Sequence, residues 1–153
     1  MTRRLNILIL GASYGSLLAT KLVMAGHHVT LVCLRHEADL INREGTTVRF
    51  PIRGRASLLE VRSRGLSGSI NAEIPANVDL KKFDLVVLAM QEPQYASEGV
   101  RHLMLTVARN KLPTMSIMNM PPMTFLRRMP GLNRQLADHQ RRADLAAIVD
   151  DLE

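Results

Sequence analysis

Small residues follow an apolar run of strand length near the start of the chain. The run Leu5 to Leu10 leads directly into Gly11, Ala12, Ser13, Tyr14, Gly15 and Ser16. A pyrophosphate can approach backbone N–H groups closely only where side chains are small. Such groups bind anions well at the start of a helix, where the helix dipole favours negative charge. The stretch therefore predicts a phosphate site, with the N–H groups of residues 14–16 facing an open crevice.

The residues around this loop predict the elements that hold it. Apolar residues recur at helical spacing from Leu17 to Ala25, Gly26 ends that pattern, and a second apolar run covers residues 28–34. A strand, a glycine turn, a helix and a strand in about 30 residues form the unit that binds dinucleotides. An ordinary turn between strand and helix in another α/β protein is the alternative.

The loop departs from the usual G-x-G-x-x-G pattern at two of its three key positions, which are Gly11, Ser13 and Ser16. Gly11 can make the tight turn. The hydroxyl of Ser13 could donate a hydrogen bond to a phosphate, and Ser16 is small enough for close packing of helix on strand. Gly15 adds flexibility one place earlier.

The end of the second strand indicates which dinucleotide binds. NAD-binding domains place an acidic residue there for the ribose hydroxyls, whereas this chain has Arg35 followed by His36. A guanidinium can bind a phosphate through two hydrogen bonds, so Arg35 favours the 2′-phosphate of NADP. The alternative is an ordinary surface arginine. We expect Glu37 in the following helix rather than at the ribose.

Several segments together resemble the ketopantoate reductase (2-dehydropantoate 2-reductase) family. The loop 11–16, the segment 25–29 and Leu34-Arg35 are similar to its N-terminal domain, and residues 83–91 and 113–119 are similar to its fourth and fifth strands. The resemblance implies a Rossmann-like NADP-binding domain that serves the reduction of a 2-keto acid or related carbonyl. The cofactor-binding residues it implies are Gly11, Ser13, Tyr14, Gly15, Ser16, Arg35, Gln91 and Asn119. Gln91 and Asn119 also lie at expected carboxyl ends of strands, where ligands bind in open α/β sheets.

The chain also departs from that family. Gln91 stands where the family usually has a lysine, and Asn119 leads into Met120-Pro121-Pro122 instead of an Asn-Gly-x-Gly loop. The family's second, helical domain, which supplies the catalytic lysine, is not expected within these 153 residues. We therefore predict an NADP(H)-binding domain that is incomplete for catalysis, with its catalytic residues unassigned. The alternative is a stand-alone, non-catalytic module that binds a nucleotide or a partner.

Composition and residue spacing argue against nucleic-acid, membrane and metal binding. The net charge is +6, but the arginines are dispersed and aromatic residues make up only 3% of the chain, so a stacking surface for nucleic acid is not expected. No apolar run approaches the roughly 18 residues that span a bilayer, and we expect a cytoplasmic protein with no membrane contact. The histidines show no metal-ligand spacing, and Cys33 reads as a small buried apolar residue.

These observations predict an α/β, doubly wound, mostly parallel sheet. The strand 5–10 should lie centrally, between the strands 29–34 and 85–90. Alternating residues predict an edge hairpin over 46–61, and residues 63–77 read as loop with one short strand at most. The dinucleotide-binding domain should cover residues 1–130 and a charged helical tail residues 131–153. The apolar stripe of that tail could contact a second copy of the chain or a separate helical domain.

Overall fold

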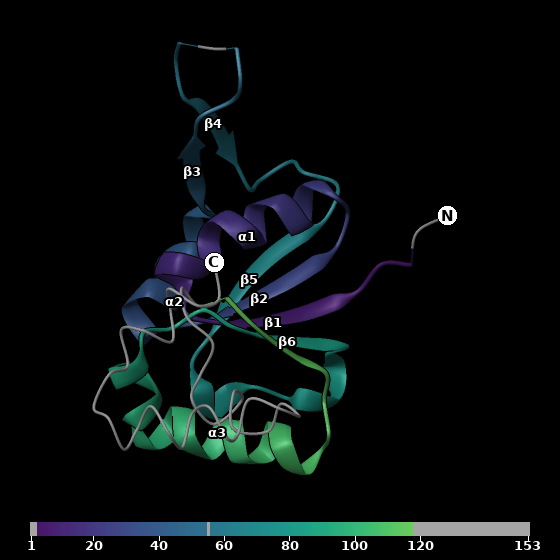
Figure 1. Cartoon of the computed structure of the whole chain (residues 1–153), viewed down its shortest axis with the longest axis vertical. Coiled ribbons are helices and arrows are strands. Elements are labelled where there is room, and N and C mark those ends of the chain that lie inside the picture. The colour runs from purple at the N-terminus through teal and green to yellow at the C-terminus, as the bar shows by residue number, and fades with distance from the viewer. Residues whose placement is uncertain (1–2, 55, 118–153) are drawn as a thin grey trace, which may run out of the picture. The chain divides into compact units, whose positions relative to one another are not determined.

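A parallel β-sheet with helices on both faces makes up the described part of the chain. The computed structural model describes residues 3–54 and 56–117. The sheet has five strands in the order β5-β2-β1-β6-β7 (Figure 1). In chain order the helices and strands are β1 (Asn6–Leu10), α1 (Ala12–Met24), β2 (His28–Val32), α2 (Arg35–Glu44), β3 (Thr47–Phe50), β4 (Leu59–Arg62), β5 (Ser69–Glu73), β6 (Leu85–Leu88), α3 (Glu98–Arg109) and β7 (Thr114–Ser116). Short 3₁₀ helices cover Pro75–Asn77, Leu80–Lys82 and Glu92–Ala96. The predicted α/β, Rossmann-like fold is confirmed.

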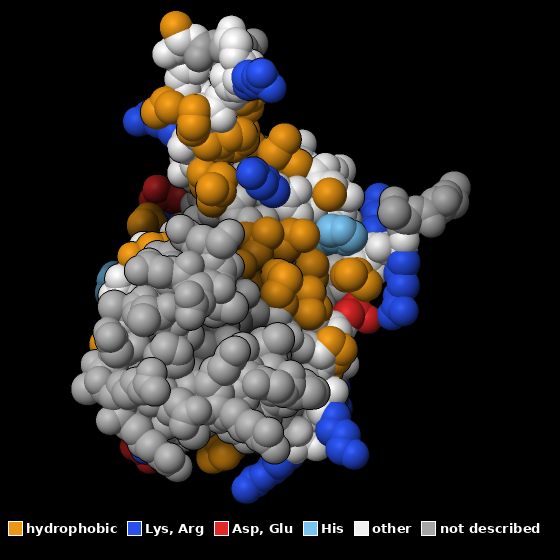
Figure 2. All heavy atoms as spheres, viewed as in Figure 1, with side chains coloured by type: hydrophobic (Ala, Val, Ile, Leu, Met, Phe, Trp, Pro, Cys, Tyr) orange, Lys and Arg blue, Asp and Glu red, His pale blue; other side chains and the backbone are white. Residues whose placement is uncertain are grey.

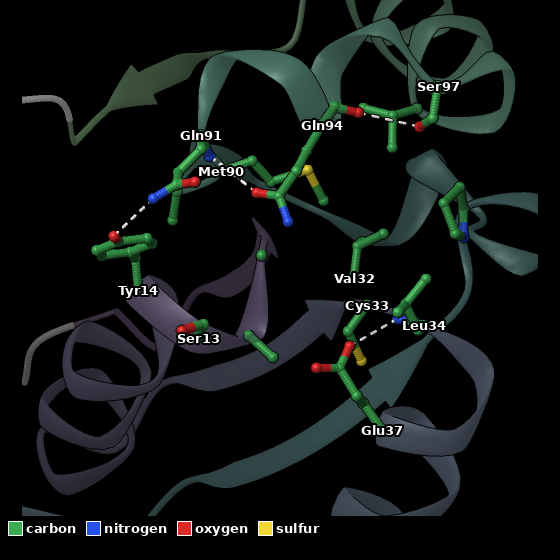
Figure 3. Close-up of a pocket in the computed structure, with 15 residues that line it drawn as sticks. Ser13, Tyr14, Val32, Cys33, Leu34, Glu37, Met90, Gln91, Gln94 and Ser97 are labelled. Carbon is green, nitrogen blue, oxygen red and sulfur yellow. Dashed lines mark hydrogen bonds between the residues drawn. The ribbon is translucent and has the colours of Figure 1, made fainter.

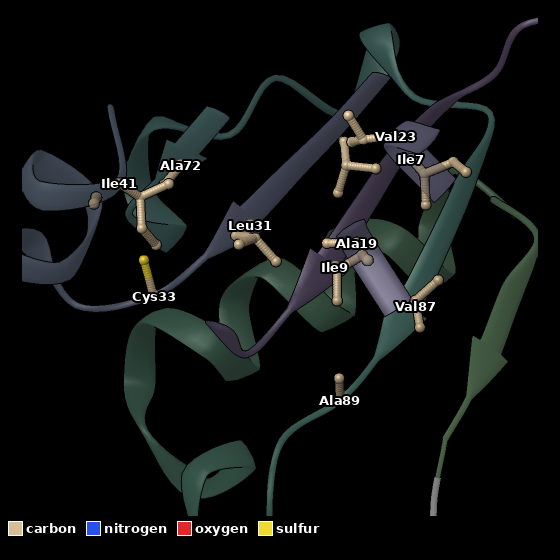
Figure 4. Packing of buried hydrophobic residues seen from close by; sticks show 12 residues of the cluster. Ile7, Ile9, Ala19, Val23, Leu31, Cys33, Ile41, Ala72, Val87 and Ala89 are labelled. Atoms are coloured by element: carbon tan, nitrogen blue, oxygen red, sulfur yellow. The ribbon is translucent and has the colours of Figure 1, made fainter. Parts of the chain in front are cut away.

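The strand β1 lies at the centre of the sheet, as predicted. It pairs in parallel with β2 on one side and with β6 on the other. Ile7 and Ile9 pack with the α1 residue Val23 on one face (Figure 4). Leu8 and Leu10 belong to the cluster on the other face, which includes residues of α3. A strand buried on both faces reads as an unbroken apolar run, which is why the sequence identified it.

The sheet continues beyond β2 through β5, the short strand that the segment 63–77 was expected at most to contain. This strand pairs in parallel with β2 over its whole length. The side-chain amide of Asn42 in α2 accepts a hydrogen bond from the Ala72 N–H at 2.8 Å and donates one to the Ala72 carbonyl at 2.9 Å. Asn42 thus occupies two backbone groups of this edge strand that no neighbouring strand pairs. Its polar composition, SINAE, hid this strand from a search for apolar runs.

The predicted hairpin is present, but its position was predicted wrongly. The strands β3 and β4 pair with each other in a separate antiparallel sheet and do not extend the main sheet. The place beside β2 is taken by β5, so the hairpin projects beyond α1 instead (Figure 1). Phe50 packs near α1, where the Lys21 ammonium lies 5.8 Å from its ring centre. On the face shown in Figure 2, Lys and Arg side chains are scattered over the hairpin and the body of the domain.

Three expectations fall outside the described residues. They are the charged helix over 131–153, the domain boundary at residue 130, and the position of Asn119. The described part of the chain contains no helix that is both long and apolar enough to cross a membrane.

Candidate functional site

A cavity of about 470 Å³ lies at the carboxyl ends of β1, β2 and β6. Residues that end or follow each of these strands form its walls (Figure 3). The lining residues are Gly11, Ala12, Ser13, Tyr14, Val32, Cys33, Leu34, Glu37, Pro75, Ala89, Met90, Gln91, Gln94, Ser97 and Val100. The strand order reverses direction at β1, and this is the place where open α/β sheets bind ligands. The volume is in the range usual for small-molecule sites.

Gly11 makes the turn between β1 and α1 at one wall of this cavity. Its φ angle is +107°, which a residue with a side chain rarely adopts. A Cβ atom here would also lie 2.5 Å from the Ala89 carbonyl oxygen at the end of β6. The Gly11 N–H donates a hydrogen bond to the Val32 carbonyl at 2.9 Å. The ends of β1, β2 and β6 therefore meet at a position that only glycine can occupy.

The first turn of α1 offers backbone donors to the cavity. The helix begins at Ala12, and its first bond runs from the Gly15 N–H to the Gly11 carbonyl at 3.2 Å. The N–H groups of residues 12–14 precede that bond, so they have no acceptor within the helix. Ala12, Ser13 and Tyr14 all line the cavity. The expected donors at residues 14–16 are thus corrected to residues 12–14, because the helix starts earlier than the spacing indicated.

Gly15 and Ser16 have roles other than those predicted from the motif. Gly15 is buried against the sheet, and a Cβ atom there would lie 2.7 Å from Cγ2 of Ile9. Gly15, not Ser16, is therefore the position that allows close packing of helix on strand. The Ser16 hydroxyl donates a hydrogen bond to the Ala12 carbonyl at 2.5 Å. Neither residue lines the cavity.

A hydrogen bond joins the start of α1 to the loop after β6. The amide Nε2 of Gln91 donates to the Tyr14 hydroxyl at 2.8 Å (Figure 3). The Gln91 N–H donates to Oε1 of Gln94 at 2.9 Å, and the Met90 N–H donates to the Tyr95 hydroxyl at 3.1 Å. Burial raises the pKa of Tyr95, so its phenol is protonated at neutral pH. The structure thus brings together Tyr14 and Gln91, two of the predicted site residues, at this cavity.

The end of β2 presents a carboxylate to the cavity. Arg35 is the first residue of α2; its side chain is exposed and does not line the cavity. Glu37, which the sequence placed in the helix and away from the ribose, lies in the helix and does line the cavity. Its Oε2 accepts a hydrogen bond from the Leu34 N–H at 2.9 Å. An acidic residue three positions after a helix cap commonly turns back in this way, and that spacing was the available signal.

The thiol of Cys33 lies beside this carboxylate in the cavity wall. Burial, reinforced by the negative charge of Glu37, raises the pKa of Cys33 to about 11. The thiol is therefore protonated at neutral pH and is not a nucleophile there. Among residues 3–54 and 56–117 no group of three or more His, Cys, Asp or Glu side chains could hold a metal ion.

Comparison with known proteins adds a structural neighbour. No known protein family matches this chain, and no curated protein does so either. Among solved structures, the chain is similar to a probable 2-dehydropantoate 2-reductase from Bacillus subtilis, with 26% sequence identity and a TM-score of 0.48. The similarity covers 75% of this chain and 34% of that one. The fold itself is established by the strand order and register of this chain.

The lining of the cavity determines which ligands can bind there. The exposed or half-buried apolar side chains of Leu34, Pro75 and Met90 suit a flat ring system, and the backbone donors of α1 suit a phosphate. No lysine lines the cavity within the described part of the chain. The arrangement can therefore bind a nucleotide, but the described lining holds no ammonium group that could polarise a carbonyl.

Proposed function

We propose that this chain is a dinucleotide-binding domain that holds NADP(H) in the cavity at the carboxyl ends of β1, β2 and β6. The observation that carries the proposal is the start of α1. Residues 12–14 line the cavity beside Gly11, and their N–H groups have no acceptor within the helix. A pyrophosphate satisfies such donors and is stabilised by the positive end of the helix dipole.

Arg35 supports NADP as the dinucleotide. It directly follows Leu34, which lines the cavity, and its exposed guanidinium stands on the first turn of α2. A long, unburied side chain at that place can reach a 2′-phosphate on a ribose held near the end of β2. Gln91 and Asn119 are the proposed positioning groups for the nicotinamide half, and Asn119 lies outside the described residues.

The reaction proposed for this domain is reduction of a 2-keto acid or a related carbonyl, on the basis of the resemblance to ketopantoate reductases. The cofactor would supply the hydride, and the protein would position it. We propose that the 153 residues bind the cofactor without turnover, in the cytoplasm, and that a separate helical domain or a second copy completes the site. The alternative is a stand-alone binding module.

Calorimetric titration with NADPH tests the binding site. The unmodified chain should bind NADPH, and Ser13→Leu should abolish binding while the far-UV circular dichroism spectrum is unchanged. A leucine there would occupy the space that the phosphate needs next to the free N–H groups. Ala108→Leu, at an exposed position of α3, is the control for adding a leucine to a helix surface. Unchanged affinity in Ser13→Leu would rule out this loop as the phosphate site.

An absorbance assay with NADPH and excess ketopantoate tests whether the chain is complete. We expect no turnover, because no lysine lines the described cavity to polarise the carbonyl. Turnover on the order of 1 s⁻¹ or faster would show instead that these residues contain a whole active site.

A further inference from the structure

A smaller cavity lies at the free edge of the parallel sheet, apart from the proposed dinucleotide site. Its volume is about 280 Å³, just below the range usual for drug-sized ligands. Its walls come from the end of α2, the turn that leads from β4 into β5, and the start of β5. The two cavities share no lining residue. The smaller one therefore suits a different ligand, smaller than a dinucleotide.

The strand β5 leaves backbone groups unpaired at this cavity. It is the outermost strand on its side of the sheet, with β2 as its neighbour (Figure 1). Successive residues of a parallel strand turn their N–H and C=O groups to opposite sides. The Glu73 carbonyl accepts the Cys33 N–H at the end of β2 at 3.1 Å, so Glu73 faces β2, whereas Ala72 and Ile70 face outward. Among the described residues, neither the N–H nor the C=O of Ile70 has a hydrogen-bond partner on that outer side.

Asn42 shows which chemical group binds an outward-facing backbone pair on this edge. Its carboxamide accepts the Ala72 N–H at 2.8 Å and donates to the Ala72 carbonyl at 2.9 Å. Ile70 lies two residues earlier on the same edge, presents the same donor and acceptor, and lines the cavity. A ligand that offers an N–H and a C=O side by side can pair with Ile70 in the same way. A peptide backbone offers such a pair, and peptides bind other proteins by adding to a free sheet edge.

Arg64 supplies a positive charge where this edge begins. It lines the cavity, and one of its N–H groups donates to the Arg43 carbonyl in the last turn of α2. The other donors of the guanidinium make no hydrogen bond within the described residues. The backbone N–H groups of Arg64 and Gly65, which also line the cavity, have no acceptor in that part of the chain either. Free arginine donors of this kind favour a carboxylate.

Packing holds Arg64 in place at the cavity. A Cβ atom at Gly45, the residue that ends α2, would lie 3.2 Å from Cγ of Arg64 and 2.7 Å from Oγ of Ser63. Ser63 is buried, and its hydroxyl accepts the Thr46 N–H at 2.9 Å. The arginine stem therefore lies against a fixed turn, and its guanidinium is oriented before a ligand binds. A group oriented in advance loses less entropy on binding.

We propose that this cavity binds the carboxyl terminus of an extended peptide. The peptide adds to the free edge of β5 in antiparallel orientation, pairs with the N–H and C=O of Ile70, and places its terminal carboxylate at Arg64. The orientation follows from the two ends of the edge. Arg64 precedes β5, whereas Asn42 already occupies Ala72 and stops further pairing. Only the last few residues of a peptide are held, which agrees with the volume of the cavity.

An NMR titration of the isotope-labelled chain with acetyl-trialanine, which ends in a free carboxylate, tests the ligand class. The amide resonances of Ile70, Arg64 and Gly65 should shift, and that of Ser13 in the larger cavity should not. The same peptide with a carboxamide in place of its carboxylate should bind roughly tenfold more weakly, as for the loss of a charge-assisted hydrogen bond. Equal affinities of the two peptides would overturn the inference. Acetate that binds as tightly as the peptide would also overturn it, since pairing with Ile70 would then contribute nothing.

A substitution tests the arginine. Arg64→Gln removes the charge, but the glutamine amide can still donate to the Arg43 carbonyl, so the end of α2 is retained. The affinity for acetyl-trialanine should fall roughly tenfold. Arg62→Gln is the matched control, because that arginine is exposed on β4 and does not line the cavity; it should leave the affinity unchanged. Equal affinities of the two variants would contradict the assignment.

A titration with NADPH separates this inference from the proposed function. Arg64→Gln should bind NADPH as tightly as the unmodified chain does, because Arg64 lies outside the larger cavity. An unmodified chain that binds NADPH but not acetyl-trialanine would overturn the peptide site and leave the proposed function standing.

Discussion

Gly15 lies so close to Ile9 that a single added carbon would reach 2.7 Å from the isoleucine Cγ2 atom. Both residues are buried at the contact between α1 and β1. The contact fixes the height of the helix above the sheet, and with it the position of the N–H groups that line the cavity. Packing and ligand binding are therefore connected through one glycine that does not itself line the site.

Gly15→Ala should destabilise the fold. The methyl group has no room unless helix or strand moves, and overpacking of this kind costs about 1–3 kcal/mol of unfolding free energy. Chemical denaturation followed by circular dichroism measures the loss. Gly99→Ala is the matched control in α3, where the new Cβ would lie 3.5 Å from Pro75. Alanine there should raise stability by up to about 1 kcal/mol. Equal effects of the two substitutions would show that the contact with Ile9 is not restrictive.

Arg35→Ala should weaken NADPH binding far more than NADH binding. Only NADPH carries the 2′-phosphate, and a charge-assisted contact with it is worth about 1.5–3 kcal/mol, or roughly tenfold to more than a hundredfold in affinity. Titrations of both cofactors against the unmodified chain and the variant give the comparison. Arg43→Ala, at the far end of the same helix, controls for the loss of one positive charge. An equal loss of affinity for the two cofactors would show that Arg35 does not contact the 2′-phosphate.

Cys33 should react slowly with alkylating reagents in the folded protein. Its pKa is raised to about 11 from the ordinary 9.0, so at pH 8 far less thiolate is present than in the unfolded chain. Iodoacetamide labelling, followed by mass spectrometry with and without denaturant, measures the difference. A folded-state rate equal to the denatured rate would mean that the thiol is neither buried nor protonated.

The raised pKa of Cys33 also predicts how the stability of the fold changes with pH. A raised pKa means that the folded state holds the Cys33 proton more tightly than the unfolded state does. The resulting stabilisation is complete below about pH 9 and is lost as the pH rises towards 11. The midpoint temperature of thermal unfolding should therefore fall more steeply between pH 9 and 11 for the unmodified chain than for Cys33→Ala. Parallel curves for the two proteins would contradict the assignment.

The sequence by itself determined the order of the main elements. The unbroken apolar runs of β1 and β6 identified strands buried on both faces, because such strands need no alternation. Gly11 could be recognised as the turn residue, since an apolar strand that ends in small residues has few other interpretations. The cavity-lining positions of Gly11, Ser13, Tyr14 and Gln91 followed from where strands end.

The tertiary structure decided which residue performs which role. Motif spacing assigned close packing to Ser16, but the helix begins at Ala12 and turns Gly15 towards Ile9. The first residue of a helix sets the direction of every later side chain. The polar strand β5 forms through pairing with β2 and contacts from Asn42, which local pattern does not report. Glu37 faces the cavity because its carboxylate turns back to the Leu34 N–H. Each of these depends on contacts between segments distant in the chain or on the exact start of a helix, and residue types alone specify neither.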